Sequence, residues 1–67
     1  MRKGDTVRLV DRGTHYLHLE NGDLGVVLDP DYDGCAPHIM RVRFFRTLLE
    51  ESMYRSRFEV VHHVQAG

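Results

Sequence analysis

Hydrophobic and polar residues alternate along two stretches of the chain, residues 5–11 and 38–46. Side chains two residues apart share one face of a β-strand, so this period predicts two strands that are each buried on one face. The residues expected to face the core are Val7, Leu9, Met40, Val42 and Phe44.

Three further strands are predicted from shorter apolar runs. Residues 24–29 follow the turn signal Asn21-Gly22 and end at Pro30, which has no amide proton to continue a ladder. A weaker strand is expected near residues 48–53. The last strand covers residues 58–62, with Phe58 and Val60 inward, and follows a helical turn at residues 55–57.

Residues 12–20 show neither a helix cap nor a helical apolar stripe. They are expected to form a long, partly extended loop with Leu17 and Leu19 tucked in, or else a short strand arm. Five short strands then make an all-β chain, and closing them into a small antiparallel barrel would limit exposed sheet edges.

Composition narrows the class of protein. The 67 residues predict a single domain over residues 1–67 with a small core. One cysteine excludes an intrachain disulfide and fits a reducing cytoplasm. Nine Lys+Arg against ten Asp+Glu argue against a strongly basic nucleic-acid or membrane protein. No apolar run is long enough for a membrane span, and no secretory signal is expected.

Four sequence blocks resemble the small SH3-like barrel: Lys3-Gly4-Asp5-x-Val7-x-Leu9, Asn21-Gly22-Asp23-x-Gly25-x-Val27, Arg41-Val42-Arg43-Phe44 and Arg57-Phe58-Glu59-Val60. The second block resembles a KOW element, which implies contacts with RNA or polymerase. The third and fourth resemble the barrels of photosystem I subunit IV and of ferredoxin–thioredoxin reductase variable chains, which imply docking to a larger protein complex. The resemblance also implies that Leu24 and Val27 point inward.

Two groups of residues suggest a metal site. Asp29, Asp31 and Asp33 with Gly34 match the opening of an EF-hand calcium loop, but Met40 stands where the bidentate glutamate belongs. Zinc is suggested by His15-x-x-His18 and Cys35-x-x-His38, with His62 and His63 further on. A solvated acidic loop and scattered surface histidines explain the same residues, so no metal and no cofactor is expected.

A basic and aromatic surface is the strongest indication of function. Its candidate residues, for binding a partner or nucleic acid, are Arg8, Arg41, Arg43, Phe45, Arg46, Arg55 and Arg57. Arginine suits carboxylate and phosphate because its donors form a fork, and a neighbouring aromatic ring can stack on a base. The alternative is a solvated strand face whose arginines pair with Glu50, Glu51 or Glu59.

A domain this small is not expected to enclose a catalytic cleft, so an enzyme is not predicted. The first hypothesis is a non-catalytic interaction module that docks a protein partner through the arginine-bearing face and residues 15–19. The alternative is a KOW-like RNA- or DNA-binding accessory domain that uses Arg41, Arg43, Arg46 and Phe45. A third interpretation is homo-oligomerisation through a sheet edge.

Overall fold

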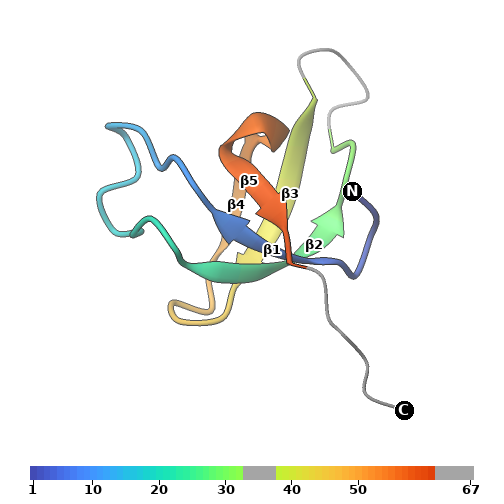
Figure 1. Ribbon diagram of the computed structural model, residues 1–67, viewed down its shortest axis with the longest axis horizontal. Coiled ribbons are helices and arrows are strands. Elements are labelled where there is room, and N and C mark those ends of the chain that lie inside the picture. Colours follow the sequence, from blue (N-terminus) through green and yellow to red (C-terminus); the bar gives the residue numbers. More distant parts are fainter. Residues whose placement is uncertain (33–37, 62–67) are drawn as a thin grey trace.

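The computed structural model describes residues 1–32 and 38–61. Within these ranges the chain forms five β-strands and one turn of 3₁₀ helix (Figure 1). In chain order they are β1 (Thr6–Leu9), β2 (Leu24–Asp29), β3 (Ile39–Phe44), β4 (Glu50–Tyr54), η1 (Arg55–Arg57) and β5 (Phe58–Val60). The all-β prediction and the helical turn at residues 55–57 are therefore confirmed. In the same ranges no helix has the length and hydropathy needed to cross a bilayer.

All strand pairs are antiparallel, and the strands lie in the order β4-β3-β2-β1-β5. Figure 1 shows β1 between β2 and β5. Over residues 1–32 and 38–61 there is no ladder between β4 and β5, so hydrogen bonds do not close the sheet. The two edge strands are instead joined in sequence by η1, whose first amide, that of Arg55, donates to the carbonyl of His38 at 3.0 Å.

The core forms on one face of the strongly twisted sheet. Its buried residues come from all five strands and from one loop: Val7, Leu9, Leu19, Val27, Met40, Val42, Phe44, Met53 and Phe58. Period-2 alternation puts alternate side chains of β1 and β3 on this face, as predicted. Val27 is also inward as expected, and Val60 is partly buried against the core.

The prediction that Leu24 faces the core is wrong, because this residue is 42% exposed. Leu24 and Val27 are three positions apart, so an unbroken strand directs them to opposite faces. The register does shift in β2, but only between Val27 and Asp29, beyond both residues. Gly25 takes the inward position in place of Leu24.

Gly25 sits where β2 and β3 approach each other closely. A Cβ atom added there would lie 2.7 Å from the carbonyl oxygen of Arg43 and 2.7 Å from Cγ1 of Val42. The oxygen belongs to the backbone of β3 and cannot move independently of the ladder. A glycine is therefore required for space at this position.

The connection from β1 to β2 covers one side of the core as a loop, not as a strand arm. Leu19 is completely buried, whereas Leu17 is 73% exposed, so only one of the two leucines expected inside is there. Tyr16 is partly buried against the core and its hydroxyl donates to the carbonyl of Ser52 at 3.1 Å. The loop thereby bonds to β4, at the far edge of the sheet.

Candidate functional site

The seven predicted binding residues lie in three separate regions of the structure. Arg8, Arg41 and Arg43 lie on the outer face of the sheet, opposite the core. Phe45 and Arg46 follow β3 in the turn that leads to β4, and Arg55 and Arg57 belong to η1. Four of these six arginines, Arg8, Arg41, Arg46 and Arg57, form ion pairs within the chain.

Cross-strand carboxylates bind two arginines of the outer face. Arg8 on β1 pairs with Glu59 on β5, its direct neighbour in the ladder. Arg41 on β3 donates from Nε to Glu50 at 3.1 Å. Opposite charges that face each other across strands stabilise a sheet. For Arg8 and Arg41 the structure therefore agrees with the alternative interpretation, a strand face whose arginines pair with glutamates.

Arg41 is held by two more contacts. Its Nη1 donates to Oγ of Ser52 at 3.0 Å, and its guanidinium lies 5.4 Å from the ring centroid of Tyr32. That distance is within the range of a cation–π interaction. Arg41 would have to release these partners before it could bind a phosphate or an acidic protein.

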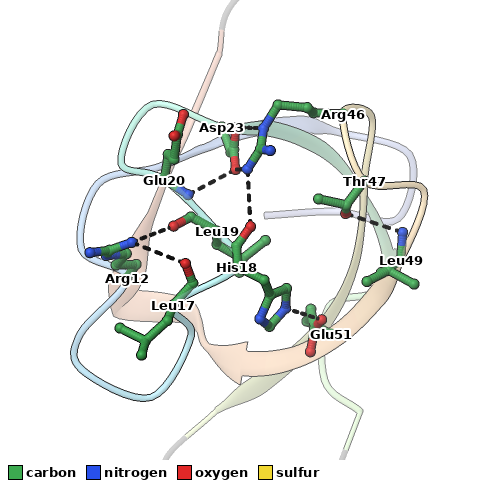
Figure 2. Close-up of polar contacts among 10 residues, drawn as sticks. All are labelled: Arg12, Leu17, His18, Leu19, Glu20, Asp23, Arg46, Thr47, Leu49 and Glu51. Carbon is green, nitrogen blue, oxygen red and sulfur yellow. Dashed lines mark hydrogen bonds and ion pairs between the residues drawn. The ribbon is translucent and has the colours of Figure 1, made fainter.

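Arg46 fastens the β1–β2 loop to the β3–β4 turn, as Figure 2 shows. Its Nε and Nη2 donate to the two carboxylate oxygens of Asp23 at 2.9 and 2.7 Å, and Nη2 also donates to the carbonyl of His18 at 3.1 Å. Nε2 of His18 in turn lies 2.7 Å from a carboxylate oxygen of Glu51. The fork of Arg46 therefore joins two loops of the fold, and its Nε and Nη2 donors already have acceptors within the chain.

Asp23 is the acidic member of this network, with a side chain only 9% exposed. The hydrogen bonds from Arg46 lower the pKa of its carboxyl, and a bond from the amide of Glu20 at 2.9 Å acts in the same direction against the effect of burial. A carboxyl with a lowered pKa in the folded state stabilises the fold most above its unfolded-state pKa. This contribution is lost as the pH falls through the lowered folded-state value.

The three remaining arginine positions differ in their surroundings. Arg57 donates to the carbonyl of Asp11 at 3.0 Å, with the carboxylate of the same residue 3.8 Å away. In the described part of the chain, Arg43 and Arg55 make no ion pair. They are thus the two arginines of the predicted set whose charge has no acidic partner among the described residues.

Exposed apolar residues gather where β2 begins and β3 turns into β4. The amide of Phe45 donates to the carbonyl of Leu24 at 3.0 Å, so these residues are neighbours, and they are 51% and 42% exposed. Leu48 lies in the same turn as Phe45: its amide donates to the carbonyl of Phe44 at 2.9 Å, and the residue is 65% exposed. We call Leu24, Phe45 and Leu48 the apolar patch. The sequence analysis predicted Phe45 as a binding residue but assigned Leu24 to the core. Counting alternate positions back from the inward Val27 would have placed Leu24 on the exposed face.

The apolar patch borders the one outer-face arginine of β3 that lacks an ion pair within residues 1–32 and 38–61. Val26 on β2 pairs with Arg43 on β3, next to the pair formed by Gly25 and Phe44. Arg43 therefore lies one step along the outer face from the level of Leu24 and Phe45. A partner that covered the patch would meet an aromatic ring, two leucines and a guanidinium.

Metal binding gains no support from the described residues. Over residues 1–32 and 38–61, no three His, Cys, Asp or Glu side chains gather in a way that could hold an ion. Asp33, Cys35, His62 and His63, which the calcium and zinc hypotheses use, lie outside the described residues.

Comparison of the chain with protein-family models, with curated proteins and with solved structures finds no significant match.

Proposed function

We propose that this chain is a non-catalytic module that docks a protein partner through the apolar patch. The observation that carries the proposal is the exposure of Leu24, Phe45 and Leu48 at one end of the sheet. Clustered apolar side chains on a small soluble domain cost free energy in water, and burial by a partner recovers it. Aromatic residues with arginine beside them are typical of the energetic centre of a protein–protein interface.

The pairing of the arginines supports a protein partner over a nucleic acid. Arg8, Arg41, Arg46 and Arg57 each bind a carboxylate of this same chain. Nucleic-acid affinity comes largely from lysines and arginines that neutralise phosphates. In a chain of net charge −1, these four ion pairs reduce the positive charge that the predicted binding residues can offer to phosphates.

The fold supports an SH3-like barrel as the finer description. A long loop after β1, the strand order β4-β3-β2-β1-β5 and a 3₁₀ turn before the last strand agree with that resemblance. Of the two kinds of barrel that the sequence resembles, the one that docks to a larger protein complex fits the apolar patch better. The single cysteine fits a cytoplasmic place for such a module.

One observation favours a second candidate, a nucleic-acid-binding accessory domain. Arg43 has no ion pair in the described part of the chain and lies on the same face as Phe45, which is half exposed. A guanidinium beside an exposed ring can hold a phosphate while the ring stacks on a base. Such a domain would bind phosphates mainly through Arg43, because Arg8, Arg41, Arg46 and Arg57 already pair with carboxylates of the chain.

Salt dependence separates the two candidates. We expect fluorescein-labelled mixed-sequence RNA and DNA oligonucleotides to show no saturable anisotropy change with the wild-type chain, even at about 20 mM salt, where phosphate contacts are strongest. The arginine variant R43A should behave in the same way. Saturable binding at low salt that weakens steeply with added salt, and that F45A and R43A each reduce, would support the nucleic-acid function and contradict the docking proposal.

A further inference from the structure

A pocket of about 400 Å³ lies at the opposite end of β3 from the apolar patch. It is lined by Met1, His38, Arg55, Ser56 and Phe58. His38 immediately precedes β3, Arg55 and Ser56 belong to η1, and Phe58 begins β5. The pocket thus lies where the two edge strands come nearest to each other in sequence. None of its residues belongs to the apolar patch.

Arg55 is the polar residue that distinguishes this pocket. Its Nε atom is buried and has no hydrogen-bond partner within the described residues. It also makes no ion pair there, whereas Arg57, two positions further on, is bonded to Asp11. A buried donor without an acceptor costs free energy, and a ligand that supplies the acceptor recovers it.

A backbone hydrogen bond holds η1, the element that carries Arg55, in place before any ligand arrives. The Arg55 amide donates to the carbonyl of His38 at 3.0 Å, which fixes η1 against the start of β3. His38 itself has a φ of 57°, a conformation that side-chain-bearing residues seldom adopt and that is often found at binding sites. A preformed pocket spares the ligand the entropy of ordering it.

We propose that this pocket binds a carboxylate carried on a short apolar stem, with Arg55 as its principal ligand-binding residue. The guanidinium fork offers parallel donors that match the two oxygens of a carboxylate. Phe58 and Met1 supply apolar walls for the stem, and Ser56 adds a hydroxyl donor. The apolar side chains of Met1 and Phe58 beside Arg55 favour a singly charged carboxylate on an apolar stem over a doubly charged phosphate, whose desolvation costs more.

Two groups of a partner protein carry such a carboxylate: the side chain of an aspartate or glutamate, and the C-terminus of the chain. Two probes separate them. N-acetylphenylalanine presents a terminal carboxylate, and the dipeptide N-acetyl-Glu-Phe-amide presents only a side-chain carboxylate. N-acetylphenylalanine amide has the same stem without the charge and is the control.

The test is an NMR titration of the ¹⁵N-labelled chain that follows the Arg55 Nε–H signal and the amides of Ser56 and Phe58. We expect saturable shifts at these positions with at least one carboxylate probe and none with the amide control. R55Q should weaken binding about tenfold or more, because a charge-assisted hydrogen bond is lost. R43Q removes an arginine outside the pocket and should leave the affinity unchanged.

Three results would overturn the proposal: no saturation with either probe, equal binding of the amide control, or equal affinity of R55Q and the wild type. If R55Q does not fold, the Nε–H signal of the wild type still decides, since a bound carboxylate must shift it. The apolar patch takes no part in this titration. The outcome of the titration is therefore independent of whether the chain docks a protein through Leu24 and Phe45.

Discussion

Replacing Gly25 by alanine should destabilise the fold by about 2–3 kcal/mol, because the new methyl group has no space. It would lie 2.7 Å from the Arg43 carbonyl oxygen, so β2 and β3 must separate at the centre of the sheet. Glycine to alanine within a strand is otherwise favourable, since it reduces the entropy of the unfolded chain. The sign of the effect therefore tests the close approach directly.

Urea denaturation followed by circular dichroism measures the change. A chain of 67 residues has roughly 3–10 kcal/mol of stability in total, so a loss of this size shifts the midpoint strongly or unfolds the variant. L24A is the matched control, because it alters the neighbouring residue on the exposed face and should change stability by about 0.5 kcal/mol or less. A G25A variant as stable as the wild type would show that β2 and β3 are not packed as described.

The second large effect is expected from Leu19, which anchors the β1–β2 loop in the core. L19A should cost about 2–5 kcal/mol, the range for truncating a fully buried leucine. L17A, two residues earlier in the same loop, removes a side chain that is 73% exposed and should change stability by about 0.5 kcal/mol or less. The two variants make the same chemical change in the same loop, so their difference isolates burial.

Thermal and urea unfolding of both variants provide the measurement. Equal effects of L17A and L19A would mean that the loop does not cover the core in the way the structure shows. A loss confined to L17A would mean that the loop has the opposite register.

Local pattern predicted most of the fold. Alternation in residues 5–11 and 38–46 identified Val7, Leu9, Met40, Val42 and Phe44 as core, because side-chain period is a property of the strand itself. Pro30 and Asn21-Gly22 delimited β2 correctly, since turn chemistry is also local. Strand ends were less accurate: the fourth strand begins at Glu50 and ends at Tyr54, later than the expected residues 48–53.

What the sequence could not predict depends on contacts between distant residues. The partners of Arg46 and Arg57, Asp23 and Asp11, lie 23 and 46 positions away, so the chain folds them together without any local signal. The sequence therefore overestimated how many of the predicted arginines have guanidinium donors free to bind another molecule. Leu24 was misplaced for a different reason: an inward register was taken from the resemblance where the apolar run itself gave no alternation.

Affinity capture from an extract of the native host tests the docking claim most directly. The wild-type chain and Y54S, which alters an exposed aromatic residue paired with Ile39 at the other end of β3 from the apolar patch, should retain the same protein in stoichiometric amount after nuclease treatment. F45S and L24S, after circular dichroism has verified that they fold, should retain at least about tenfold less of it, as expected when an aromatic or leucine anchor is removed from an interface. A protein retained equally by F45S and by the wild type, or a signal that nuclease abolishes, would contradict docking through the apolar patch.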